Sequence, residues 1–154
     1  MMQNMFGMPD AYAQIQGNAD NAQVHGKVSF YGMHNGTLVV AEIFGLPNTM
    51  DKANGNFYGF HIHEGASCTG DEEDPFKNTK SHYNPEQAEH PKHAGDLPPL
   101  LANAGLAWSA VYTERFYPED LIGRTVVIHD MADDFHTQPS GDSGMKIACC
   151  EIVA

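Results

Sequence analysis

Seven side chains of the types that bind metal ions are concentrated in four short stretches of this chain. Six are histidines and one is an aspartate: His61, His63, His82, His90, His93, Asp96 and His129. Imidazole is a favoured ligand of copper and zinc, and a carboxylate adds a harder oxygen ligand. Seven groups are more than one ion usually takes. They suit two adjacent ions, one of which can change its oxidation state.

The spacing of these residues indicates which elements must position them. Side chains alternate between the two faces of a strand, so in Gly59-Phe60-His61-Ile62-His63 both histidines point the same way. His129 ends a second β-branched run and can meet them from a neighbouring strand. The other four residues, from His82 to Asp96, fall in a polar segment rich in proline and glycine, which predicts a loop.

Three further histidines have no such neighbours. A lone histidine is usually a hydrogen-bonded structural residue. We therefore expect structural roles for His25, His34 and His136.

Eight short runs with strand character are separated by turn signals such as His34-Asn35-Gly36. The runs cover residues 11–17, 24–31, 37–44, 56–64, 100–103, 106–112, 125–129 and 145–153. Short strands with glycine-rich connections predict an all-β antiparallel sandwich or flattened barrel. Two long connections, 65–99 and 130–144, interrupt the pattern, and loops of this length are usually functional or disordered. The candidate ligands in the first favour a functional loop.

The length of 154 residues predicts one domain over residues 11–154, preceded by a flexible tail over residues 1–10. Four methionines in that tail offer soft Cu(I) ligands, although a disordered tail is the favoured interpretation.

No run approaches the ~20 apolar residues that span a bilayer, so no membrane partner is expected. The N-terminus lacks the features of a secretory signal. This predicts a cytoplasmic protein, with a mature or trimmed form of an exported protein as the alternative.

Twenty acidic groups against eight basic ones give a formal net charge of −12. Nucleic acid is therefore not an expected partner, because binding to phosphates requires a basic surface. An anionic substrate would need a local region of positive potential. Most of the negative charge is interpreted as a feature that keeps the protein soluble.

Five segments of the chain closely resemble the copper/zinc superoxide dismutases. They are Gly-Phe-His-Ile-His-Glu at 59–64, His-Tyr-Asn-Pro at 82–85, His-Ala-Gly-Asp-Leu at 93–97, Gly-Arg-Thr-Val-Val-Ile-His at 123–129 and Lys-Ile-Ala-Cys at 146–149. The resemblance runs from about residue 11 to the C-terminus. The short connection from His82 to Asp96 and the stretch Gln138-Pro139-Ser140-Gly141 are more similar to bacterial than to animal members. The implied fold is an eight-stranded Greek-key β-sandwich.

The resemblance implies two metal sites that share His82, and disproportionation of superoxide to oxygen and hydrogen peroxide by a redox-cycling copper. The implied copper ligands are His61, His63, His82 and His129. The implied zinc ligands are His82, His90, His93 and Asp96. Asp133 is implied as the carboxylate that links His61 to His90, a role not assigned to the adjacent Asp134. Without the resemblance, Asp133 would be interpreted as an ordinary surface acid.

Two residues are implied to act on the substrate. His82 would return a proton to the second superoxide. Lys146 stands where the family usually carries an arginine that guides superoxide. The positive charge remains, but the planar guanidinium group with its paired N–H donors is lost. The alternative is that Lys146 only pairs with a nearby acid and guidance comes from elsewhere. Arg124 is expected to be structural.

Three cysteines allow one disulfide with one cysteine left over. The resemblance implies that Cys68 pairs with Cys149, which leaves Cys150 as a small apolar side chain. The resemblance also allows a homodimer and a copper donor protein as partners.

The principal alternative function is a copper-binding or metal-storage protein on the same fold without significant turnover. The lysine at position 146 is the sequence feature that favours it. A zinc hydrolase is less well supported, because it needs an open coordination position and the second group already offers four protein ligands.

Overall fold

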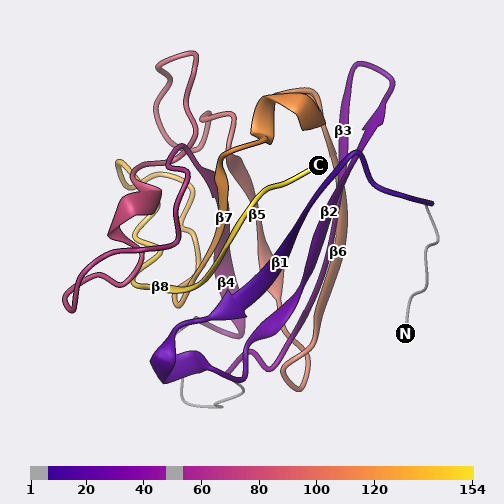
Figure 1. The fold of residues 1–154 in the computed structure, drawn as a ribbon. Helices are drawn as coiled ribbons and strands as arrows, with labels where there is room; N and C mark the ends of the chain where they lie inside the picture. Colours follow the sequence, from indigo (N-terminus) through magenta and orange to yellow (C-terminus); the bar gives the residue numbers. More distant parts are fainter. Residues whose placement is uncertain (1–6, 48–53) are drawn as a thin grey trace.

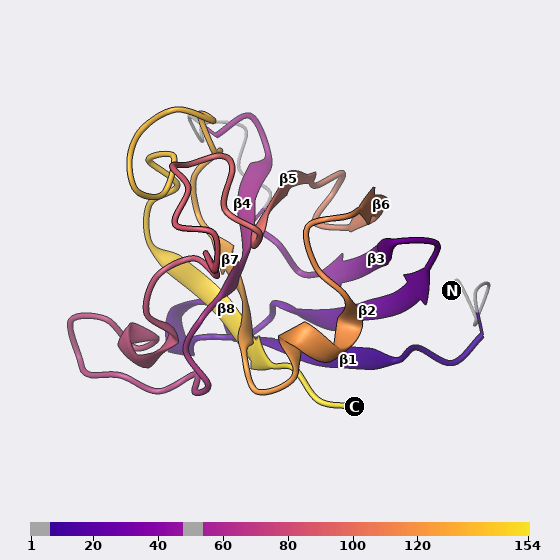
Figure 2. The same cartoon turned by 90° about the horizontal axis from the view of Figure 1, so that it is seen from above.

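A computed structural model describes residues 7–47 and 54–154 of the chain. Eight antiparallel strands form one sheet in the order β5-β4-β7-β8-β1-β2-β3-β6. The strands are β1 (Ala11–Gly17), β2 (His25–Met33), β3 (Gly36–Phe44), β4 (Phe57–His63), β5 (Asp96–Leu101), β6 (Ala107–Thr113), β7 (Thr125–His129) and β8 (Lys146–Glu151). The end strands β5 and β6 contact each other, so the sheet curls into a nearly closed barrel (Figures 1 and 2).

The predicted all-β, eight-stranded fold is confirmed, and each predicted run overlaps one observed strand. The chain crosses from β3 to β4 and from β6 to β7, and each crossing joins strands that are not hydrogen-bonded to each other, as in a Greek key. The described residues also form three 3₁₀ helices, η1 (Ala19–Asn21), η2 (Lys77–Thr79) and η3 (Pro118–Leu121). Within the described ranges, no helix has the length and apolar character needed to cross a membrane.

The N-terminal prediction falls partly outside the described residues. Residues 1–6, with three of the four tail methionines, are not among them, and neither are residues 48–53. Met8 is described and its side chain is exposed. The Asp10 backbone N–H donates to Phe30 O at 2.9 Å, which brings the chain onto β2 just before β1 begins.

Strands β4 and β7 are buried on both faces, which is the feature that positions the site. Their inward side chains, such as Ile62 and Ile128, join the apolar core of the barrel. Full burial of an isoleucine contributes about 1.5–3 kcal/mol, so this core stabilises the position of the two strands. Their outward side chains include His61, His63 and His129, which are buried as well. These outward faces therefore need a second layer to cover them.

The two long connections supply that layer. The connections after β4 and after β7 lie together on one side of the barrel, beside β4, β7 and β8 (Figures 1 and 2). Phe76 and Cys68 of the first connection pack against Val127 and Cys149 on the outer faces of β7 and β8.

The prediction that Asp96 lies in a loop is wrong. Asp96 is the first residue of β5 and pairs in register with His61 of β4. The prolines that follow it, Pro98 and Pro99, made the segment look like a loop. Because β5 lies at the end of the sheet order, these prolines are tolerated as they are on other edge strands.

Candidate metal centre

The first ligand group consists of four buried histidines on three separate segments. His61 and His63 come from the outward face of β4, and His129 ends β7, which pairs with β4. His82 arrives from the long connection, where an isolated β-bridge pairs it with His63. The Tyr83 N–H donates to Ile62 O at 2.8 Å and continues this strand-like pairing. One candidate ligand atom from each of the four side chains lies within 4.8 Å of the others.

The hydrogen bonds of two of these rings determine which nitrogen is free. His63 Nδ1 lies 2.8 Å from Lys80 O, and His129 Nδ1 lies 3.4 Å from Gly144 O. A carbonyl can only accept, so each Nδ1 carries the proton and each Nε2 carries a lone pair. These two Nε2 atoms lie 3.3 Å apart. Two lone pairs at this distance repel each other unless a cation lies between them.

Two more buried ring nitrogens point to the same conclusion. His61 Nδ1 and His82 Nε2 have no hydrogen-bond partner within the described chain. An unpaired buried polar atom is costly unless something satisfies it. The four-nitrogen group therefore fits a copper ion, which imidazole ligands suit.

The second ligand group contains three imidazoles and one carboxylate, a set typical of zinc. Its members are His82, His90, His93 and Asp96. His82 Nδ1 lies 2.7 Å from Asp96 Oδ1 and 3.3 Å from His93 Nδ1. His90 Nδ1 lies 3.0 Å from Asp96 Oδ2. His82 thus presents Nε2 to the first group and Nδ1 to the second.

Asp133 forms a hydrogen bond with one histidine of each ligand group. Its Oδ2 lies 2.9 Å from His61 Nε2, and its Oδ1 lies 2.7 Å from His90 Nε2. Each ring donates its N–H to this carboxylate, which turns its Nδ1 toward the ligand groups. A Cβ at Gly141 would lie 2.0 Å from Asp133 Oδ1, so only glycine fits against the carboxylate there. The neighbouring Asp134 instead accepts loop N–H groups from His136 and Thr137.

Burial keeps the ligand histidines neutral. Desolvation is the largest cause that lowers the pKa of His61 and of His63 well below its ordinary value. Desolvation, followed by the charge of His82, lowers the pKa of His129 to about 4. Burial alone would raise the pKa of Asp96, but the hydrogen bond from His82 and the neighbouring imidazoles lower it overall. All four groups are therefore in the deprotonated state that binds metal at neutral pH.

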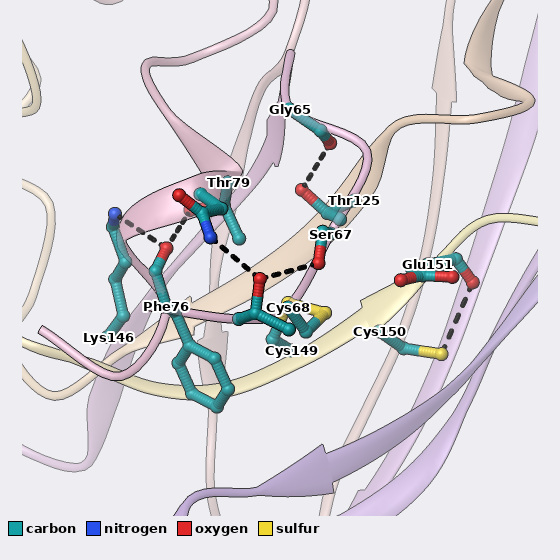
Figure 3. The surroundings of a disulfide bond; sticks show 12 residues. Gly65, Ser67, Cys68, Phe76, Thr79, Thr125, Lys146, Cys149, Cys150 and Glu151 are labelled. Carbon is teal, nitrogen blue, oxygen red and sulfur yellow. Dashed lines mark hydrogen bonds between the residues drawn. A yellow bond between two sulfur atoms is a disulfide. The ribbon is translucent and has the colours of Figure 1, made fainter. Parts of the chain in front are cut away.

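Lys146 begins β8 beside His129, with which it pairs in register. Its Nζ lies 3.3 Å from Asp74 Oδ2. Nζ also donates to Phe76 O at 3.2 Å (Figure 3). Its charge is one of the smaller causes, after burial, that lower the pKa of His129. Lys146 thus lies near the first ligand group and is also paired with an acid.

The disulfide between Cys68 and Cys149 is present and joins residues separated by 81 positions (Figure 3). It ties the first long connection to β8. Cys150 is a free, half-buried cysteine that packs against the core, and burial raises the pKa of its thiol. Arg124 lies over the Tyr83 ring at 4.0 Å, consistent with the predicted structural role.

The three histidines predicted to be structural lie outside both ligand groups. His25 stacks on Phe44, His34 contacts Tyr112, and His136 is an exposed side chain beside Asp134.

Sequence reasoning missed several residues that hold the centre in place. Gln138 accepts from His90 N–H and donates to His90 O, both at 2.8 Å, which joins the two long connections. Arg115 donates to Pro91 O at 2.8 Å and to His93 O at 3.0 Å. Asp74 and Lys80 were missed for the same reason. Their partners are distant in the sequence or on the main chain, so no local pattern indicates them.

Comparisons with known proteins agree with this geometry. The family model described as copper/zinc superoxide dismutase (SODC) matches residues 24–152. The extracellular superoxide dismutase [Cu-Zn] of Rattus norvegicus is 28% identical over 142 residues, covering 86% of this chain and 56% of that protein. The superoxide dismutase [Cu-Zn] of Brucella abortus is 30% identical over 135 residues, covering 77% of this chain and 78% of that protein. The chain spans 55–64% of the length of the mammalian extracellular relatives that it matches.

A solved structure also shares the fold. A double mutant of a SOD-like protein from Bacillus subtilis superposes with a TM-score of 0.74 at 27% identity, covering 93% of this chain and 97% of that one. The family match extends over most of the chain and includes the ligand groups, Asp133 and the disulfide. The chain belongs to the copper/zinc superoxide dismutase family.

Proposed function

We propose that this protein disproportionates superoxide to oxygen and hydrogen peroxide. In this proposal copper is held by His61, His63, His82 and His129, and zinc by His82, His90, His93 and Asp96. Copper supplies one-electron exchange between its two oxidation states. The observation that carries the proposal is the placement of His82, whose two ring nitrogens face two separate ligand groups.

A pocket of about 580 Å³ gives a small anion access to the first group. It is lined by His63, His82 and His129, together with Lys146 at the start of β8. The lining of this pocket therefore includes three of the four proposed copper ligands.

His82 is suited to hold and release a proton at Nε2. Its Nδ1 is fixed against Asp96 and His93, so the ring keeps its orientation while Nε2 changes partner. A proton taken up at Nε2 would lie in the pocket, where the departing peroxide needs it.

Lys146 would provide positive charge at the pocket beside His129. Asp74 and the Phe76 carbonyl hold its ammonium in place. A lysine offers a point charge where an arginine would offer two parallel donors, so we expect weaker orientation of the anion.

A copper-binding protein without significant turnover is the second candidate. Two observations favour it: Lys146 is paired with Asp74, which offsets its charge, and the Bacillus subtilis structure is described only as SOD-like. This candidate shares the metal groups with the first, so only turnover separates them.

The test is superoxide decay catalysed by protein reconstituted with one copper and one zinc. His129→Ala, prepared identically, removes a proposed copper ligand. His136→Ala, which alters an exposed histidine outside both groups, is the matched control. Fast decay by the wild type and by His136→Ala, but not by His129→Ala, would support the enzyme. Full metal loading with decay no faster than that of His129→Ala would refute it.

A further inference from the structure

Lys80 occupies a backbone conformation that favours glycine. Its φ is 62° and its ψ is −145°, a combination found almost exclusively at glycine. Two hydrogen bonds hold this conformation: the Lys80 N–H donates to Lys77 O at 3.1 Å, and Lys80 O accepts from His63 Nδ1 at 2.8 Å. Both bonds use the main chain, so glycine would serve them equally well. The lysine side chain therefore needs a separate explanation.

The charges that line the pocket indicate what that explanation is. Its cationic side chains are Lys80 and Lys146, and its carboxylates are Glu64 and Glu89. Lys146 is mostly buried and paired with Asp74, so its charge is offset. Lys80 is exposed, and its ammonium forms no ion pair with any residue that the structure describes.

We propose that Lys80, the cation of this pocket that forms no ion pair within the described residues, draws anions into the pocket against its two carboxylates, Glu64 and Glu89. The inference rests on the proposed function, since it names the residue that guides the substrate to the same site. A chain with a formal charge of −12 repels anions at long range, so attraction must come from a local cation. Lys80 lies two residues before His82, and its carbonyl is bonded to His63. Its backbone is thus fixed to the metal centre.

The disulfide loop determines how much Lys146 can add to this attraction. Cys68 is bonded to Cys149, three residues beyond Lys146 on β8, and the same loop presents the Phe76 carbonyl to the Lys146 ammonium (Figure 3). Asp74 of this loop also contacts that ammonium, at 3.3 Å. Replacement of Asp74 by asparagine would remove the compensating charge and leave the carbonyl contact. The inference therefore predicts that removal of the Lys80 charge weakens anion binding at the pocket, whereas removal of the Asp74 charge strengthens it.

The experiment measures azide binding to the copper- and zinc-loaded protein by its visible absorption, at low and at high ionic strength. Azide is an anion that binds copper, and its titration needs no turnover. The variants are Lys80→Gln, Lys80→Gly, Lys80→Arg and Asp74→Asn. Lys27→Gln is the matched control, because it makes the same charge change at an exposed position on β2.

We expect Lys80→Gln and Lys80→Gly to weaken azide binding about two- to five-fold at low ionic strength, as expected for one charge about 5–10 Å away. High salt should reduce the difference. Lys80→Arg and Lys27→Gln should bind as the wild type does, and Asp74→Asn should bind azide more tightly.

Equal azide affinities for Lys80→Gln, Lys80→Gly and Lys27→Gln at low ionic strength would overturn the inference. Loaded protein that binds azide in this pattern but does not turn over superoxide would refute the proposed function and leave the role of Lys80 standing. Absence of the copper absorption band would refute both.

Discussion

His63 and His129 face each other through Nε2 atoms 3.3 Å apart, while the other nitrogen of each ring is bonded to a backbone carbonyl. The protein therefore holds two lone pairs in contact inside a buried site. This arrangement disfavours the metal-free protein and favours any cation that binds between the rings.

Metal binding should accordingly stabilise the fold strongly. Free copper and free zinc, each at about 1,000 times its dissociation constant, would each add about 4 kcal/mol to the free energy of unfolding, as a ligand does that binds only the folded state. Thermal unfolding with and without the metals measures this gain. His129→Ala should lose the copper-dependent part of the gain, and His34→Ala should keep all of it. Equal midpoints with and without metals would contradict the prediction.

Asp133→Asn should weaken both metal sites together. The carboxylate accepts an N–H from His61 and from His90, whereas an amide has only one acceptor oxygen and its NH₂ group would face the N–H of the other ring. Loss of such a partner typically costs about 10- to 100-fold in metal affinity. Competition with chelators of known affinity measures the change.

The control for that experiment is Asp134→Asn. Asp134 accepts N–H groups of its own loop rather than the rings of the two ligand groups. Its replacement should leave both metal affinities near their wild-type values. Similar losses in the two variants would show that loop folding, and not orientation of the histidines, is responsible.

The metal-free protein should lose stability as the pH falls from about 6.5 toward 4. Desolvation lowers the pKa of His61, His63 and His129, in the last case to about 4, whereas the unfolded chain titrates near 6.5. In this window the unfolded chain binds more protons than the folded protein, so stability rises with pH. His129 alone accounts for roughly 3 kcal/mol across the whole window.

Urea unfolding of the metal-free protein at a series of pH values measures this dependence. The urea midpoint of His129→Gln should fall less steeply with decreasing pH, because this variant lacks one of the histidines whose pKa is lowered by folding. His136→Gln should follow the wild type, since its side chain is exposed. A urea midpoint that stays constant from pH 7 to pH 4.5 would contradict the prediction.

Removal of the disulfide should destabilise the protein by roughly 4 kcal/mol in the chain-entropy model for a loop of this size. The bond joins positions 81 residues apart and holds Phe76 against Val127 on the outer face of β7. The double variant Cys68→Ser, Cys149→Ser should therefore unfold at lower urea than the oxidised wild type. Cys150→Ser, which leaves the bond intact, is the control, and a midpoint shared by all three proteins would refute the prediction.

Lys80→Gly should stabilise the protein, in spite of the lost side chain. A non-glycine residue in this conformation stores about 1–3 kcal/mol of strain, against roughly 0.5–1 kcal/mol of additional chain entropy that glycine loses on folding. Lys80→Ala removes the same side chain but keeps the strain, so it is the matched comparison. We expect the glycine variant to be more stable than the alanine variant by about 1 kcal/mol in urea unfolding. The reverse order would show that the conformation is not strained.

Much of the fold could be predicted because its signals are local. Alternation with a period of two residues identified the strand that carries His61 and His63, and the same rule placed both on the face away from Ile62. The spacing of the ligands matched one family, and that match implied the disulfide and the role of Asp133. Prolines misled the prediction at Asp96, because composition does not indicate which strand lies at the end of a sheet.

What the sequence by itself determined is the set of ligand types and the strands that carry some of them, because side-chain chemistry and strand periodicity are properties of neighbouring residues. Only the tertiary structure decided that Lys146 pairs with Asp74, that Gln138 binds the His90 backbone, and that Lys80 adopts a glycine-like conformation at the pocket. These contacts join segments up to 72 residues apart, or depend on main-chain geometry that distant partners impose. No local pattern specifies them, because they form only when the long connections pack onto the barrel.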